Sequence, residues 1–175
     1  MPDFTPHELV DIVDESDTAL YQAAKSEAHA KGLLHRTVTA GLINSKGDWI
    51  LVEQAADRQD ASQYVWPMGG HVQAGEAIET AVQREVMEEM GMSDFEFCLI
   101  GKTIFRRNVL GRDENHLFIL YEIHSDAQPQ ISHESVGYKT FSAMDLKQII
   151  KERPELFGGS FHFVVKPFYP ELFTA

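Results

Sequence analysis

Three glutamates at helical spacing are the residues of this sequence best suited to do chemistry. Glu85, Glu88 and Glu89 stand at positions i, i+3 and i+4 of a segment predicted to be helical from Ala77 to Met90. At about 100° per residue their side chains fall on one face of that helix. Like charges at this spacing repel by about 0.2–0.5 kcal/mol per pair, so the arrangement has a cost that needs an explanation.

The direction of this acidic face suggests the explanation. Ile78 and Ala81 occupy the same arc one or two turns earlier, and an apolar stripe normally faces the protein interior. A solvated acidic face would lie opposite that stripe, whereas these glutamates continue it. Carboxylates aimed inward need a partner, and hard cations such as Mg²⁺ are bound by oxygen ligands. We therefore predict a divalent metal site, with an ordinary solvated face as the alternative.

The residues around these glutamates resemble the signature segment of the Nudix family, the Nudix box, from Gly70 to Met92. The family pattern is glycine, five residues, glutamate, seven residues, then arginine, glutamate, an aliphatic residue, any residue, two glutamates, any residue, glycine and an aliphatic residue. Val86 fills the first aliphatic position and Met92 is an acceptable apolar residue at the second. The seven fixed positions are all met, by Gly70, Glu76, Arg84, Glu85, Glu88, Glu89 and Gly91.

This resemblance implies a fold and a reaction. The implied fold is α/β: a Nudix α/β/α sandwich with a mixed β-sheet and the box as a loop–helix–loop. The length fits a single domain over residues 1–175, with its core at about 34–152. The implied reaction is hydrolysis of a diphosphate linkage in a small molecule, such as a nucleoside diphosphate linked to another group, with Mg²⁺ or Mn²⁺ as cofactor.

The resemblance also implies a role for each box residue. The implied metal ligands are the carbonyl of Gly70 and the carboxylates of Glu85, Glu88 and Glu89. Arg84 would hold the helix through an ion pair with Glu76, and Gly91 would end it, so these three are structural. The proton of the attacking water would pass to a box glutamate or to Glu134. Glu134 precedes Tyr138-Lys139-Thr140-Phe141, which is similar to a family stretch with tryptophan in place of Thr140; a solvated loop acid is the alternative.

The N-terminal half resembles a narrower group, isopentenyl-diphosphate isomerase and its Nudix relatives. The resemblance rests on Val10 to Glu15, His29, Leu34-His35-Arg36 and Gly70-His71. The isomerase has an acid–base cysteine just before its Gly-His, where this chain has Gly69. Because proton shuttling without that cysteine would be hard, we predict a hydrolase related to the isomerase. The isomerase and a ligand-sensing module without turnover are the alternatives, although such modules usually lose box glutamates and this box is intact.

Histidines outside the box are candidates for a second metal site. His29, His35 and His71 would supply it, with Glu114 or His116 as a further ligand. These residues form no short metal-ligand motif. Scattered histidines at the surface or in hydrogen bonds are therefore the competing interpretation.

Candidate substrate contacts are Arg58, Trp66 and Arg106. An arginine can hold a phosphate with two parallel hydrogen bonds, and a tryptophan can stack on a base. The alternative for the arginines is charge compensation on an acidic surface. For Trp66 the alternative is a place in the core, which we favour.

Composition limits the partners. The formal net charge is −12, and such a surface repels nucleic acid polymers and anionic membranes. No apolar run approaches the ~20 residues of a membrane span. Residues Met1 to Glu15 contain no lysine or arginine and do not resemble a secretion signal. We therefore expect a cytoplasmic protein, with the single cysteine, Cys98, buried as a structural thiol.

Hydrophobic periodicity and turn residues predict the elements that position these groups. The predicted strands are Leu9–Val13, Thr37–Ile43, Trp49–Gln54, Phe95–Phe105 and Leu117–His124. The predicted helices are Ala23–Lys31, Ala77–Met90 and Ala143–Glu152, the last capped by Ser142. We expect a mixed sheet with helices on both faces. An aromatic tail closes the core or forms a homodimer contact: Phe157, Phe161, Phe163, Phe168, Tyr169 and Phe173.

Overall fold

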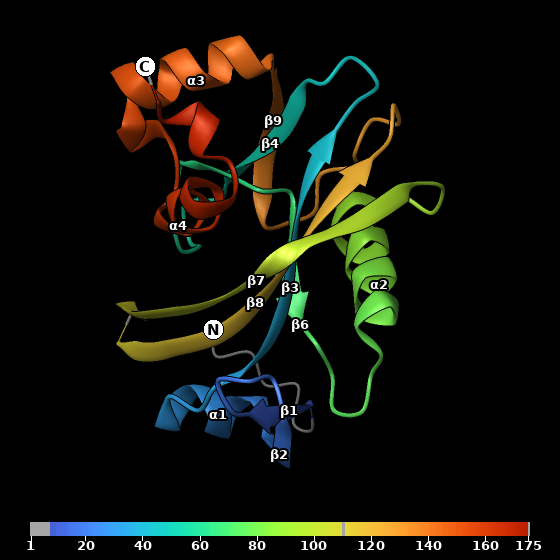
Figure 1. Ribbon diagram of the computed structural model, residues 1–175, viewed down its shortest axis with the longest axis vertical. Coiled ribbons are helices and arrows are strands. Elements are labelled where there is room, and N and C mark those ends of the chain that lie inside the picture. The colour runs from blue at the N-terminus through green and yellow to red at the C-terminus, as the bar shows by residue number, and fades with distance from the viewer. Residues whose placement is uncertain (1–7, 110, 175) are drawn as a thin grey trace.

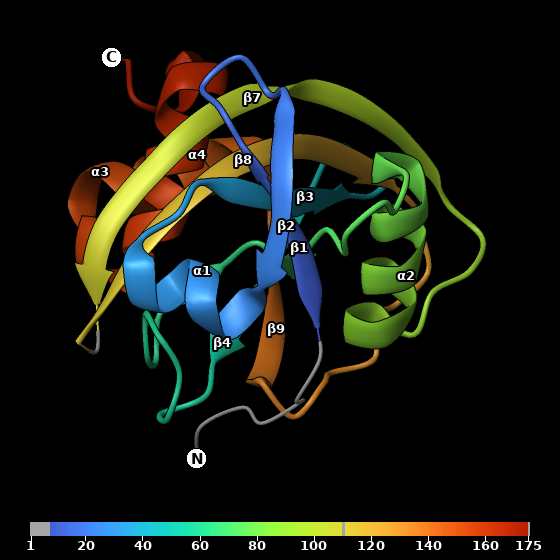
Figure 2. The same ribbon diagram turned by 90° about the horizontal axis from the view of Figure 1, so that it is seen from below.

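The computed structural model describes residues 8–109 and 111–174, whose strands form one nine-stranded mixed sheet with helices on both faces (Figures 1 and 2). The strands are β1 (Leu9–Val13), β2 (Ala19–Ala24), β3 (His35–Ile43), β4 (Trp49–Gln54), β5 (Tyr64–Val65), β6 (Met68–His71), β7 (Glu96–Val109), β8 (Arg112–His124) and β9 (Ser135–Phe141). The helices are α1 (Lys25–Lys31), α2 (Ile78–Met90), α3 (Ala143–Glu152) and α4 (Gly159–Phe168). The predicted α/β fold with a mixed sheet is confirmed.

Strand β3 is the junction of the sheet. Strand β8 runs parallel to it over its whole length, from His35 opposite His116 to Ile43 opposite His124. The other edge of β3 pairs antiparallel in turn with β1, β6 and β4. Side chains at the start of β3 therefore lie close to three neighbouring strands at once.

The two faces of the sheet are packed by different helices. Along β8, Phe118 and Leu120 belong to the core beneath α3 and α4, whereas Ile119 and Tyr121 belong to the core beneath α2. This alternation follows from the period of two of a β-strand. Both faces of β8 are thus apolar, as expected for a strand covered on both sides. Among the described residues, no helix is long and apolar enough to cross a membrane.

The aromatic tail closes the core beneath α3 and α4. Phe157 and Phe161 are each 1 % exposed, and the hydroxyl of Tyr169 donates a hydrogen bond of 2.6 Å to Glu122 on β8. Most of the tail is helix α4, which periodicity did not predict. It contains Pro167, which lies in its last turn, and a proline inside a segment counts against a helix there.

Other departures from the predicted elements lie in the N-terminal part and on β7. Ala23 and Ala24 belong to strand β2, so the helix predicted from Ala23 begins at Lys25. The prediction of a buried Cys98 is wrong: its side chain is exposed. Within the described residues, β7 pairs with β8 alone, which makes it an edge strand whose residues alternate between packing and solvent. Strands β2, β5, β6 and β9 were not predicted.

The contact between Tyr169 and Glu122 predicts how firmly the tail is held. We expect Tyr169→Phe to lower the free energy of unfolding by about 1–2 kcal/mol, because Glu122 loses a charge-assisted hydrogen bond. The matched control is Tyr138→Phe, at an exposed tyrosine of β9, which we expect to stay within about 0.5 kcal/mol of the wild type. Urea unfolding measures both, and equal effects of the two substitutions would contradict the expectation.

Candidate active site

A cleft of about 930 Å³ collects most of the residues singled out in the sequence. It is lined by Gly70 and the three glutamates of α2, by Arg58 and Glu134 from two loops, and by residues of α1, β3 and β6. Its other polar lining includes His29, His71, His116, Arg84, Arg107 and Glu114. The structure therefore brings the box together with the candidate histidines.

Glu85 is the most buried of the three glutamates on α2. It is 7 % exposed, and its carboxylate lies so close to the backbone of Gly70 that any Cβ atom at that position would overlap it. The glycine is therefore needed for a close approach, since a side chain has no room there. Burial raises the pKa of Glu85 to about 7, because it disfavours the ionised form more than the neighbouring Arg84 favours it.

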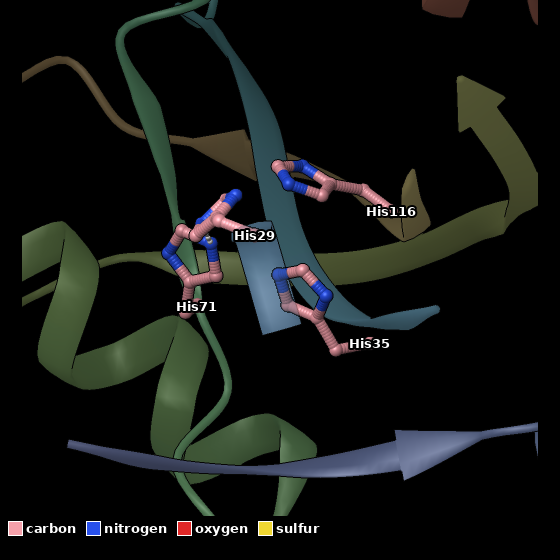
Figure 3. A group of neighbouring side chains, drawn as sticks. All are labelled: His29, His35, His71 and His116. Carbon is pink, nitrogen blue, oxygen red and sulfur yellow. Dashed lines mark hydrogen bonds between the residues drawn. The ribbon is translucent and has the colours of Figure 1, made fainter. Parts of the chain in front are cut away.

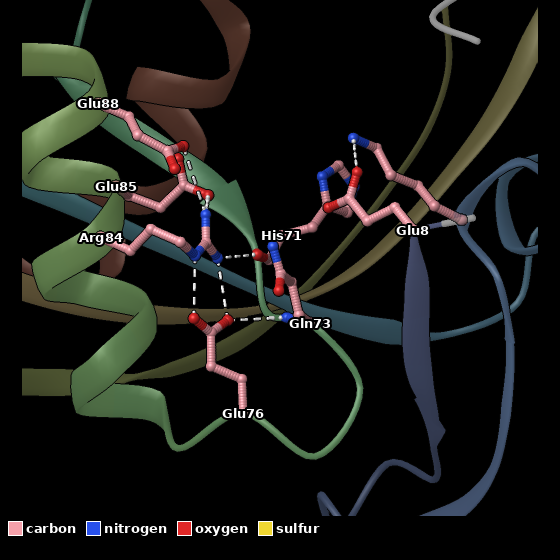
Figure 4. Close-up of polar contacts among 8 residues, drawn as sticks. Glu8, His71, Gln73, Glu76, Arg84, Glu85 and Glu88 are labelled. Carbon is pink, nitrogen blue, oxygen red and sulfur yellow. Dashed lines mark hydrogen bonds and ion pairs between the residues drawn. The ribbon is translucent and has the colours of Figure 1, made fainter. Parts of the chain in front are cut away.

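Arg84 ties the helix to the loop before it (Figure 4). Its Nε and Nη2 atoms each donate a hydrogen bond of 2.9 Å to the carboxylate of Glu76. Nη2 also donates to the carbonyl oxygen of His71 at 2.9 Å, and Nη1 donates to Glu85 at 2.6 Å. The structure thus contains the predicted Arg84–Glu76 ion pair. Gly91 ends the helix in a left-handed conformation, with φ of 62°.

The other two glutamates differ from Glu85. The side chain of Glu88 is 57 % exposed and lies 3.5 Å from Nη1 of Arg84. Glu89 is half-buried and accepts a hydrogen bond of 3.0 Å from the Ser132 hydroxyl. All three glutamates line the cleft, but only Glu85 is buried. The arc that they share is wide enough for one edge to be buried and the other to face solvent.

The charges around the box fit a divalent cation. Five carboxyl groups lie around the box. In the ion pairs that the described residues form there with lysine or arginine, four of them share only two guanidinium groups, those of Arg84 and Arg58. When ionised, these acids carry three charges more than the two cations balance; they are Glu76, Glu85, Glu88, Glu89 and Glu134. Oxygen donors with surplus negative charge are the ligands that Mg²⁺ and Mn²⁺ favour, so the residues present fit such an ion.

Glu134 and Arg58 lie together in the cleft. An ion pair of 3.0 Å joins Arg58 Nη1 to Glu134 Oε1. Burial, together with the charge of Glu134, raises the pKa of Glu89, which indicates that Glu134 is near the box. Both residues line the cleft that also holds the glutamates of α2.

The other two candidate substrate contacts are placed differently. Trp66 is 6 % exposed and packs near Trp49 and Tyr169, so the favoured core position is correct, although one part of it borders the cleft. Arg106 does not line the cleft. Its side chain is 58 % exposed and pairs with Glu15 at 2.9 Å.

Arg107 occupies the position in the cleft that was predicted for Arg106. Arg107 lines the cleft and pairs with Glu114 at 2.8 Å and with Asp60 at 3.2 Å. Consecutive residues of a strand point to opposite faces, so only one of Arg106 and Arg107 can face the cleft. The sequence alone did not indicate which one, because both are arginines.

The candidate histidines form a cluster (Figure 3). His29 of α1, His35 of β3, His71 of β6 and His116 of β8 each present a ring nitrogen, and these four atoms all lie within 4.8 Å of one another. Burial lowers the pKa of His35 and lowers that of His71 well below its usual value. Both rings are therefore neutral at pH 7. Of the two further ligands considered, His116 joins the cluster.

Comparison with known proteins extends these observations. Residues 33–159 match the NUDIX domain. The chain is 29 % identical to isopentenyl-diphosphate Delta-isomerase 2 of Photorhabdus laumondii, over 90 % of each chain. It is 40 % identical to an uncharacterized Nudix hydrolase of Nostoc sp., over 49 % of this chain and 52 % of that protein. Its fold is similar to a crystal structure of DR0079 from Deinococcus radiodurans, with a TM-score of 0.73, 22 % identity and coverage of 93 % and 99 %.

Because Glu85 lies so close to Gly70, adding one methyl group at Gly70 should disturb the proposed metal site. We expect Gly70→Ala to weaken Mg²⁺ or Mn²⁺ binding by at least about tenfold, because the new Cβ displaces the carboxylate. Gly69→Ala is the matched control, since its Cβ would meet no other atom closer than 3.7 Å, at Thr39 Oγ1. Isothermal titration calorimetry measures the affinities. Similar losses in both variants would show that the approach is irrelevant to the ion.

The ion pair between Arg84 and Glu76 predicts a pH dependence. Hydrogen bonds from Arg84 lower the pKa of Glu76 below its ordinary 4.5, so its stabilising effect is complete above pH 4.5 and is lost as pH falls through the lower folded value. We expect Glu76→Gln to lower the free energy of unfolding by about 1–2 kcal/mol at pH 7. Urea unfolding of both proteins from pH 7 to about pH 3 should show this difference shrinking; a difference independent of pH would contradict the assignment.

Proposed function

This chain belongs to the Nudix family, because the NUDIX domain covers residues 33–159, and from that premise we propose that it hydrolyses a diphosphate linkage in a small molecule with the help of Mg²⁺ or Mn²⁺. The observation that carries the proposal is the contact of the Glu85 carboxylate with Gly70 at the wall of a cleft. The cleft also holds the other box glutamates. Its volume of about 930 Å³ lies in the range of small-molecule sites.

The metal ligands in this proposal are Glu85, Glu88, Glu89 and the Gly70 carbonyl. A bound divalent cation supplies charge neutralisation at the bridging phosphates and lowers the pKa of a water molecule. Arg84 and Glu76 hold the helix and its loop in register, so that the carboxylates stay on the cleft side. Glu134 accepts the proton of the attacking water. The water oxygen forms a bond to phosphorus as the bond to the bridging oxygen breaks, and the second phosphate leaves as an anion.

Arg58 gives Glu134 a substrate-dependent role in this proposal. In the structure Arg58 neutralises Glu134, with 3.0 Å between them. An arginine fork matches the geometry of phosphate, so a substrate phosphate competes for Arg58. Glu134 then loses its ion pair, and becomes a better base, only when a phosphate is bound. Arg107 also lines the cleft, but its ion pairs with Glu114 and Asp60 hold it in place. We therefore assign it a structural role in the cleft wall.

An isomerase is the second candidate function. A relative named isopentenyl-diphosphate Delta-isomerase matches 90 % of the chain, which favours it. Against it, Gly69 stands at the position of the isomerase's cysteine, and Cys98, the one cysteine of the sequence, does not line the cleft. The intact box therefore favours hydrolysis.

A substrate panel tests the proposed hydrolase. The panel contains nucleoside diphosphates linked to other groups, such as ADP-ribose, and prenyl diphosphates including isopentenyl diphosphate. We expect phosphate-containing products from at least one compound in the presence of Mg²⁺ or Mn²⁺ and none with a chelator. Glu89→Gln and Glu88→Gln should each lower kcat by about 100-fold or more, since each removes a proposed charged ligand.

The matched control for these variants is Glu79→Gln, which removes one exposed acid from the same helix and should keep the wild-type rate. Cleavage that is equally fast in all three variants would show that Glu88 and Glu89 take no part in the reaction. Isomerisation of isopentenyl diphosphate without hydrolysis would replace the proposal by the second candidate. Tight binding of a panel compound with no conversion would indicate a ligand-sensing module.

A further inference from the structure

We propose that Cys98, Glu122 and His124 form a binding site for one transition metal ion of the zinc class, apart from the cleft. Cys98 lies on β7, and the other two residues lie near the end of β8. The thiol sulfur, a carboxylate oxygen and a ring nitrogen of these side chains all lie within 4.8 Å of one another. The three residues are absent from the described lining of the cleft, so the site does not depend on the proposed hydrolysis.

Strand pairing brings the three side chains to one face of the sheet. In the antiparallel pairing of β7 with β8, Cys98 stands directly opposite Glu122. His124 follows Glu122 by two residues, so both side chains point to the same face of β8. Directly opposite and diagonal neighbours on an antiparallel pair are near enough for their side chains to interact. The backbone therefore places a thiol, a carboxylate and an imidazole side by side.

Glu122 is the anchored member of this group. Its Oε1 accepts a hydrogen bond of 2.6 Å from the hydroxyl of Tyr169, and its Oε2 lies 3.0 Å from Nε2 of His124. Burial raises the pKa of Tyr169, and the hydrogen bond to Glu122 raises it further, so the hydroxyl remains the donor. Carboxylates that bind metals are commonly held by such an outer hydrogen bond. Tyr169 thus orients the carboxylate and leaves Oε2 for an ion.

The charge of Glu122 is not balanced by a permanent cation. Among the residues whose side chains the structure describes, no lysine or arginine forms an ion pair with it. Its polar partners are a phenol and an imidazole, and the imidazole is charged only when it is protonated. The Glu122 side chain is only 17 % exposed. A carboxylate that is partly removed from water without a fixed positive charge favours a bound cation.

The distances fit a tetrahedral ion after small movements of two side chains. Two nitrogen or oxygen ligands on a tetrahedral zinc ion are roughly 3.3 Å apart, near the 3.0 Å between Glu122 Oε2 and His124 Nε2. A sulfur and a nitrogen ligand on such an ion are about 3.6 Å apart, within the 4.8 Å span of the group. Cys98 and His124 are both exposed, so their side chains can rotate toward a shared ion.

The ligand types select a different ion from the one proposed for the box. Thiolate and imidazole ligands suit zinc and related transition metals, whereas Mg²⁺ takes oxygen ligands. Three protein ligands leave the fourth tetrahedral position for water. The ion would cross-link the edge strand β7 to β8, and the hydrogen bond from Tyr169 would connect it to the aromatic tail.

Sulfur reports this site specifically, because Cys98 is the one cysteine of the sequence. We expect Co²⁺ added to the reduced, metal-free protein to give the near-ultraviolet charge-transfer band of a thiolate–cobalt bond, and excess Zn²⁺ to remove it. The histidine cluster in the cleft contains no sulfur and cannot give this band. Zn²⁺ should also slow the alkylation of Cys98 by iodoacetamide by about tenfold or more, because the free thiolate is the nucleophile. Millimolar Mg²⁺ should have neither effect.

Matched variants identify the other ligands. His124→Ala and Glu122→Gln should each weaken Co²⁺ binding at Cys98 by about 100-fold or more, since even outer partners of metal ligands are worth about 10–100-fold. Tyr169→Phe removes such an outer partner and should weaken binding by about tenfold. The control is His133→Ala, at a histidine outside the group whose side chain is 82 % exposed, and it should keep the wild-type band and the protection against alkylation.

Three results would overturn the site. They are a wild-type protein without the thiolate–cobalt band, alkylation of Cys98 that is equally fast with and without Zn²⁺, and a band that stays unchanged in both His124→Ala and Glu122→Gln. In each case Glu122 and His124 form only a surface ion pair. The two wild-type measurements remain decisive even where a variant does not fold. The band should persist in Glu88→Gln, so failure of the proposed hydrolysis and failure of this site give separate signals.

Discussion

The close approach of a buried carboxylate to a glycine backbone is the constraint on which the cleft depends. Glu85 lies against Gly70, and Arg84 binds Glu85, Glu76 and the carbonyl of His71 at the same time. One guanidinium thus connects the helix, the loop before it and strand β6. Because the carboxylate is buried beside other acids, the positive charge of Arg84 offsets part of its cost, and the proposed divalent cation would offset more.

The sheet provides the frame for this arrangement through β3. One edge of β3 pairs with β8 along its whole length, and the other edge is divided among β1, β6 and β4. This division leaves the cleft lined by short segments of several elements. The aromatic tail packs on one face of the sheet, with Phe157 and Phe161 in the core, and Phe161 also borders the cleft.

The sequence predicted the residues and helix of the box better than it predicted the elements and side chains around the box. Spacing identified α2 and its end at Gly91, and the resemblance to the family implied the Arg84–Glu76 pair. All of these depend on contacts within a few turns of chain. Spacing missed α4, which contains Pro167. It also could not choose between Arg106 and Arg107, since strand register decides which one faces inward. The histidine cluster depends on pairings across β3, so four residues with no common motif became neighbours only in the folded chain.

Strand β6 has a consequence for both candidate sites. Gly70 and His71 are adjacent, one touching Glu85 and the other belonging to the histidine cluster, and they pair with Val38 and Thr37 of β3. Successive residues of a strand face opposite ways, so a single peptide unit separates the two environments. A slip of β6 by one residue along β3 would turn each side chain to the wrong side and dismantle both environments together. The geometries of the two environments therefore depend on the same pairing of Gly70 and His71 with Val38 and Thr37.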